Sequence, residues 1–138
     1  MNLLFVYGTL LPEYKHSISD LLKNKADFID EGYIYAKLYD IGDYPGLVID
    51  KSFENKVYGK IFQLHDPESI FQILDDYEGI NEKFPEENEY IRSIVKVFSG
   101  VHELEANVYI YNKEVANLPL ITSGQYLTYL KNKENAGK

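Results

Sequence analysis

Three acidic residues, Asp75, Asp76 and Glu78, stand at the expected end of a helix that begins near Pro67. The last carbonyl groups of a helix carry about half a negative charge, so anions are disfavoured there. A helix selected for stability alone would end in Lys or Arg. A carboxylate held at this point should have a raised pKa, which suits proton transfer near neutral pH. A solvated surface role is the alternative for Glu78, and it is the expected role of Asp75 and Asp76.

A second candidate segment is Tyr7-Gly8-Thr9-Leu10, which follows a continuous apolar run. A strand that ends in a glycine-containing turn leaves several backbone N–H groups close together, and such groups bind carboxylates or oxyanions. Gly8 lets a ligand approach the backbone, and Thr9 adds a hydroxyl group. The alternative is a turn without any ligand, which is the usual role of such a sequence.

Other kinds of catalytic site are not indicated by the sequence. There is no cysteine, so neither a thiol nucleophile nor a Cys-ligated metal is available. The histidines 16, 65 and 102 show no metal-binding spacing, and no serine lies in a Gly-X-Ser-X-Gly context. Asp76 and Glu78 are too close on one helix end to flank a sugar bond. We therefore expect no metal and no cofactor.

The composition limits the partners. With 138 residues and a net charge of −8, the chain is long enough for one domain and unsuited to a nucleic-acid backbone or an anionic membrane. A local basic pocket for a small acidic substrate stays possible. No signal-peptide core or membrane-spanning run is present in the sequence, so we expect a cytoplasmic protein.

The expected elements indicate an α+β fold. Asp66 and Pro67 should begin the longest helix and Gly79 should end it, while Ser123 should cap a last helix to about Leu130. Strands are expected at 3–7, 27–40, 47–49, 57–64, 90–98 and 103–111, and a short helix at 17–24. The acids at 82, 86, 87 and 89 are expected to form a solvated face. We expect one domain over residues 1–131 and a polar, disordered tail at 132–138.

Several motifs together resemble the gamma-glutamylcyclotransferase-like family. The similarity lies in Leu-Phe-Val-Tyr-Gly-Thr-Leu at 4–10, Tyr-Gly-Lys-Ile-Phe at 58–62, Leu-Asp-Asp-Tyr-Glu-Gly at 74–79 and Tyr-Ile-Arg at 90–92. Val-Tyr-Ile-Tyr at 108–111 and Ile-Thr-Ser-Gly at 121–124 also fit. Each motif alone is weak, but their order and spacing over residues 3–130 are specific.

The resemblance implies a small mixed β-barrel, cyclotransferase-like, flanked by a few helices. It implies that Glu78 is the acid/base and that the loop residues Tyr7, Gly8, Thr9 and Leu10 hold the glutamyl end of a small-molecule gamma-glutamyl substrate. Tyr111 and Arg92 are further candidates for the pocket, with packing or a surface ion pair as alternatives.

The Tyr-Gly-Thr-Leu sequence is similar to that of the gamma-glutamylamine cyclotransferase branch. Leu11 stands where this branch often has a basic residue, and Tyr126 where it often has Trp. These two departures leave the amine leaving group open.

Three functions therefore compete. The first is a cyclotransferase that releases 5-oxoproline and an amine from a gamma-glutamyl amide. The second is a non-catalytic module of the same fold that binds a small carboxylate. The third is an interaction protein whose acidic segment at 81–89 recruits a basic partner. Glu78 favours the first, because a binding module needs no proton-transferring group. The oligomeric state does not follow from these residues.

Overall fold

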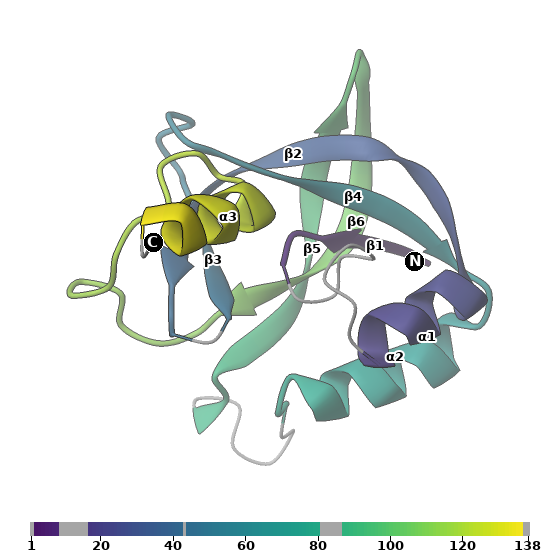
Figure 1. Cartoon of the computed structure of the whole chain (residues 1–138). Helices are drawn as coiled ribbons and strands as arrows, with labels where there is room; N and C mark the ends of the chain where they lie inside the picture. Colours follow the sequence, from purple (N-terminus) through teal and green to yellow (C-terminus); the bar gives the residue numbers. More distant parts are fainter. Residues whose placement is uncertain (1, 9–16, 43, 81–86, 137–138) are drawn as a thin grey trace.

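The computed structural model describes residues 2–8, 17–42, 44–80 and 87–136. Within these ranges the chain forms six strands and three helices (Figure 1). The strands are β1 (Leu3–Val6), β2 (Ala26–Asp40), β3 (Pro45–Ile49), β4 (Lys56–Leu64), β5 (Tyr90–Ser99) and β6 (His102–Tyr111). The helices are α1 (Ser17–Lys25), α2 (Pro67–Tyr77) and α3 (Tyr126–Ala136). These bounds agree closely with the predicted elements, except at α3.

The strands close into a mixed barrel. Their order is β3-β2-β4-β1-β6-β5, and a further pairing of Tyr33 in β2 with Phe98 in β5 joins β5 back to β2. The closed ring therefore consists of β2, β4, β1, β6 and β5, while β3 extends from β2. The pairing of β1 with β6 is parallel and the other pairings are antiparallel. The predicted α+β fold with a small mixed barrel is confirmed.

The central strand β1 has buried side chains on both faces. Phe5 packs inside the barrel with Ile61 and Val108, whereas Leu4 packs under the helices with Leu22 and Leu74. Figure 1 shows α1 and α2 together on one side of the barrel, with α3 on another. Burial on both faces explains why the sequence of β1 is a continuous apolar run rather than an alternating one.

The last helix extends further than the sequence predicted. α3 continues to Ala136, past the expected end near Leu130 and the expected tail boundary at residue 132. Two contacts attach its later turns to the end of β2: the Tyr129 hydroxyl donates to Asp40 Oδ2 at 2.6 Å, and Lys133 Nζ lies 3.2 Å from the same oxygen. Lys133, which lies beyond the expected end, thus connects the later part of the helix to a buried carboxylate.

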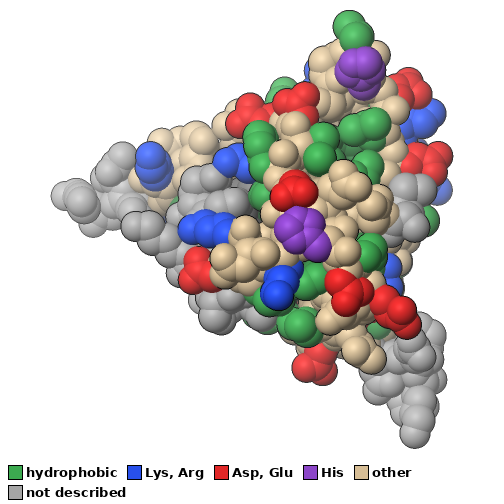
Figure 2. All heavy atoms as spheres, turned by 90° about the vertical axis from the view of Figure 1, so that its right-hand side faces the viewer, with side chains coloured by type: hydrophobic (Ala, Val, Ile, Leu, Met, Phe, Trp, Pro, Cys, Tyr) green, Lys and Arg blue, Asp and Glu red, His purple; other side chains and the backbone are tan. Residues whose placement is uncertain are grey.

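The surface over α1 and α2 carries mixed charges. Figure 2 shows acidic, basic and hydrophobic side chains interspersed over the described part of this face. Among the described residues, no helix is long and apolar enough to cross a membrane.

Candidate active site

Glu78 is the C-terminal capping residue of α2. Its backbone is still near helical, with φ −82° and ψ 0°, and its N–H donates to Leu74 O at 2.9 Å. Gly79 follows with φ +74°, and the N–H groups of Gly79 and Ile80 donate to the carbonyls of Asp76 and Asp75. This glycine-dependent cap ends the helix as predicted and fixes the point from which the Glu78 side chain projects.

Burial raises the pKa of Glu78 to about 7, and the negative charges of Glu89 and Asp75 add to this effect. The direction of the predicted shift is confirmed, but the cause differs from the one proposed from the sequence. From the sequence, the negative end of the helix was expected to raise the pKa of Glu78. In the structure, removal of the carboxyl group from water raises this pKa most, and the neighbouring carboxylates come next. At neutral pH, Glu78 is therefore divided between its protonated and ionised forms.

Buried tyrosines surround this carboxyl group. The Tyr7 hydroxyl donates to Tyr109 O at 2.5 Å, and the Tyr90 hydroxyl donates to Pro45 O at 2.6 Å. Burial raises the pKa of both Tyr7 and Tyr90 well above the usual range, and the charge of Glu78 acts in the same direction. These phenols therefore stay protonated, which leaves Glu78 as the group in this cluster that exchanges a proton near pH 7.

Asp75 has a different role from the one predicted. Its carboxylate accepts bonds from Arg92 Nε at 2.9 Å and Nη2 at 3.2 Å, and from the Tyr109 hydroxyl at 2.7 Å. Arg92 also donates to Asn107 Oδ1 at 3.1 Å, and its guanidinium lies 4.1 Å from the Phe71 ring centroid. Asp75 is thus a structural ion-pair partner rather than a solvated acid, and Arg92 takes the ion-pair role that was its alternative.

Gly8 and Tyr111 pack against the first two residues of β3, Gly8 against Pro45 and Tyr111 against Gly46. A Cβ atom at Gly8 would come within 2.5 Å of Pro45 Cγ, and one at Gly46 within 2.8 Å of Tyr111 Cγ. The Tyr111 and Tyr90 rings are 5.5 Å apart. The structure therefore brings Tyr7, Gly8, Tyr111 and Glu78 into one neighbourhood, whereas Thr9 and Leu10 lie outside the described residues.

Glu89 corrects a further expectation. The sequence grouped it with a solvated acidic face, and Glu87 is indeed exposed, but Glu89 is half-buried. It accepts a hydrogen bond from the Tyr44 hydroxyl, and its carbonyl accepts from Asn112 N at 2.7 Å. The acids at 82 and 86 lie outside the described residues. The sequence did contain a signal, because Glu89 directly precedes Tyr90, the first residue of a strand. This position determines the environment of Glu89 more than the acidic composition of the segment before it does.

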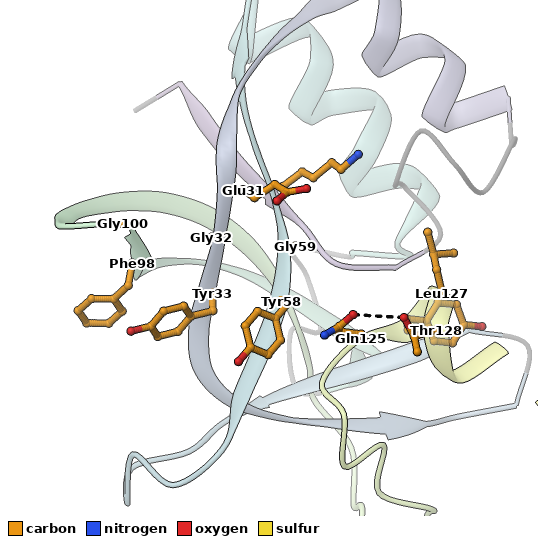
Figure 3. Close-up of a pocket in the computed structure, with 12 residues that line it drawn as sticks. Glu31, Gly32, Tyr33, Tyr58, Gly59, Phe98, Gly100, Gln125, Leu127 and Thr128 are labelled. Atoms are coloured by element: carbon orange, nitrogen blue, oxygen red, sulfur yellow. Dashed lines mark hydrogen bonds between the residues drawn. The ribbon is translucent and has the colours of Figure 1, made fainter. Parts of the chain in front are cut away.

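A separate cavity of about 500 Å³ lies between the outer faces of β2 and β4 and the start of α3. Figure 3 shows the rings of Phe98, Tyr33 and Tyr58 in a row, with Gln125 and Thr128 opposite them. Tyr33 is 5.4 Å from Phe98 and 6.0 Å from Tyr58 between ring centroids. None of the predicted site residues that the structure describes lines this cavity, so it is distinct from the Glu78 cluster.

In the described part of the chain, no group of three or more His, Asp or Glu side chains is placed to hold a metal ion. The site is a largely buried carboxyl group close to protonated phenols. Such an arrangement can accept a proton from a bound amine and return it to another atom.

The chain belongs to the gamma-glutamyl cyclotransferase, AIG2-like family, whose sequence pattern matches residues 4–128. The family supports a cyclotransferase-type function and implies a small-molecule substrate. No curated protein sequence is significantly similar to this chain.

Solved structures share the fold. YkqA from Bacillus subtilis has a TM-score of 0.73 and 24% identity over 97% of this chain, which spans 42% of the length of YkqA. An AIG2-like protein from Mus musculus has a TM-score of 0.66 and 23% identity, covering 86% of this chain and 84% of that one. The uncharacterised protein PH0828 from Pyrococcus horikoshii has a TM-score of 0.65 and 20% identity, covering 98% of both chains.

Proposed function

We propose that the protein is an intramolecular cyclotransferase of the gamma-glutamylamine type. It would release 5-oxoproline and a free amine from a gamma-glutamyl amide, with Glu78 as general acid/base. The observation that carries this proposal is the pKa of Glu78, about 7, in a buried site beside the end of β1. A general acid/base works best when its pKa lies near the operating pH, because both protonation states are then available.

The reaction needs no nucleophile from the protein. The substrate's α-amine attacks its own γ-carbonyl carbon, the new C–N bond closes a five-membered ring, and the bond to the leaving nitrogen breaks. In total the α-nitrogen loses two protons and the leaving nitrogen gains two, so no proton is consumed. Glu78 takes a proton from the α-ammonium group and returns it to the leaving nitrogen. Holding the substrate in the cyclising conformation supplies much of the rate, since effective molarities reach about 10⁵–10⁸ M.

The loop after β1 would bind the glutamyl end. Backbone N–H groups of Tyr7, Gly8, Thr9 and Leu10 would stabilise the substrate carboxylate or the developing oxyanion. Tyr111, which packs on Gly46 beside this loop, would line the pocket. These assignments are supported by the family's motif and by the electrostatic interaction of Tyr7 with Glu78.

A carboxylate-binding module without turnover is the alternative. It would use the same loop but would have no need for a buried carboxyl group with a raised pKa. Burying such a group destabilises the folded protein at neutral pH, so its presence favours the enzyme.

The test uses a panel of gamma-glutamyl amides and their N-acetylated counterparts in heavy-oxygen water, with mass detection of products. We expect unlabelled 5-oxoproline from the free amines and nothing from the acetylated compounds. Glu78→Gln should lose about 10²–10⁴-fold in kcat. Asp76→Asn, the exposed acid on the same helix end, is the matched control and should keep its activity. Labelled glutamate, or cleavage of an acetylated substrate, would identify a hydrolase instead.

A further inference from the structure

Glu89 is held firmly beside the Glu78 site. Its carbonyl accepts from Asn112 N at 2.7 Å, which continues the β5–β6 ladder one step beyond the Tyr90–Tyr111 pair. Its carboxylate accepts a bond from the Tyr44 hydroxyl. Both the backbone and the side chain are therefore fixed, although the residue directly follows an acidic segment. A hydroxyl donor of this kind stabilises a charged acceptor and orients it.

A chain of contacts connects Glu89 to the predicted substrate loop. The Tyr44 ring lies 6.1 Å from the Tyr90 ring, and the Tyr90 hydroxyl binds the carbonyl of Pro45, whose own ring faces Gly8. The charge of Glu89 also acts on Glu78, Tyr90 and Tyr111. Glu89 is thus a second carboxylate on the same tyrosine cluster, contributed by a different strand.

The two carboxylates lack a cation between them within the described ranges. Asp75, the third acid of the region, already binds Arg92 at 2.9 Å, whereas the described contacts of Glu89 include neither Lys nor Arg. Two neighbouring carboxylates that are not neutralised by the protein form a site of strongly negative potential. A ligand with a compact positive charge would complete it.

We propose that Glu89, oriented by Tyr44, binds the α-ammonium group of the substrate and presents it to Glu78. This inference rests on the proposed cyclotransferase function, because that reaction requires the α-nitrogen to enter charged and to attack uncharged. A cation placed beside Glu78 favours its ionised form, so the arriving ammonium converts Glu78 into the base that then deprotonates it. Glu89 holds the amine near the γ-carbonyl carbon.

Binding measurements separate this role from turnover. In a Glu78→Gln background, calorimetry would compare L-glutamine, a gamma-amide that carries the α-ammonium group, with 5-oxoproline, which has none. We expect Glu89→Gln to weaken L-glutamine binding about tenfold, the effect of one ion pair. Binding of 5-oxoproline, an anion, should be unchanged or slightly tighter. Glu87→Gln removes an equal charge from an exposed neighbour and is the matched control.

The outcomes distinguish this inference from the proposed function. Equal weakening of both ligands would indicate a general structural effect and would overturn the ammonium role, as would unchanged binding of both. If neither ligand bound the Glu78→Gln protein, the cyclotransferase proposal itself would fail, and this inference with it. In the active enzyme, Glu89→Gln should raise KM more than it lowers kcat. It should also move the acidic limb of the kcat/KM profile below pH 7, because one of the charges that raise the pKa of Glu78 is removed.

Discussion

Glu78 should make the folded protein less stable as the pH rises, and Glu78→Gln should remove this effect. The pKa of Glu78 is raised from 4.5 to about 7 by burial and by the charges of Glu89 and Asp75. Below pH 4.5 the carboxyl group is protonated in both the folded and the unfolded chain, so it contributes no pH dependence. Between pH 4.5 and 7 the unfolded chain loses this proton while the folded chain keeps it. The free energy of unfolding therefore falls with pH across this window.

The size of the effect follows from the pKa difference. Each pKa unit corresponds to about 1.4 kcal/mol, so the full loss above pH 7 is about 3 kcal/mol, and partial exposure of the side chain makes this an upper value. Small domains are typically stable by about 5–15 kcal/mol, so the effect is large enough to measure. Gln is neutral at every pH and keeps nearly the same shape, so the variant should gain relative stability as the pH rises.

Urea unfolding of both proteins, followed by circular dichroism at pH 4.5, 6, 7 and 8, would test this prediction. The difference in unfolding free energy should change by about 2–3 kcal/mol in favour of Glu78→Gln over this range. A constant difference in unfolding free energy, present at every pH in addition to this change, would reflect the amide group itself and would not affect the test. Glu87→Gln, at an exposed position, should differ from the parent by less than about 0.5 kcal/mol throughout. A difference between Glu78→Gln and its parent that does not vary with pH would refute the assignment of a buried, proton-exchanging Glu78.

Two further predictions concern glycines. Gly8→Val should weaken 5-oxoproline binding strongly in calorimetry, because the new side chain would meet Pro45 and displace the loop from β3; unchanged affinity in the folded variant would place the pocket elsewhere. Gly59→Ala should cost about 2–4 kcal/mol in urea unfolding, because its Cβ would lie against the Val6 carbonyl oxygen and 2.8 Å from Phe5 Cζ. Gly100 has open space around it but a φ of +59°, so Gly100→Ala should lower the free energy of unfolding by only about 1–2 kcal/mol. Similar losses of stability at Gly59 and Gly100 would contradict the close approach of β1 to β4.

Local signals were sufficient for most of the fold. Asp66 and Pro67 predicted the start of α2 and Gly79 its end, because capping and left-handed backbone depend on the residue itself. The hairpin of β5 and β6 followed from alternation on both sides of Gly100. The parallel pairing of β1 with β6 was not predictable in this way, because Leu4 and Asn107 meet only through the folded barrel.

The candidate site was predictable only in part. The helix end marked Glu78 as unusual, but the burial that dominates its pKa arises only in the folded protein, where Tyr7, Tyr90 and Tyr109 interact with its charge. The acidic composition of its segment predicted a solvated Glu89. Composition gives no indication of its hydrogen bond to Tyr44, which lies 45 positions away. Pairing between distant residues, rather than local pattern, separates these two carboxylates from the other acids of the chain.

The place of β1 in the barrel has a consequence for the order in which the protein is assembled. This strand is synthesised before the other described strands, and both of its neighbours come later: β4 ends at Leu64 and β6 at Tyr111. The segment that carries Tyr7 and Gly8 therefore has to wait, with its apolar side chains uncovered, until at least residue 111 has left the ribosome. Such long-range closure slows folding and exposes a nascent chain to association or to chaperones. Tyr7 and Gly8 are thus synthesised well before the later strands that complete the Glu78 cluster.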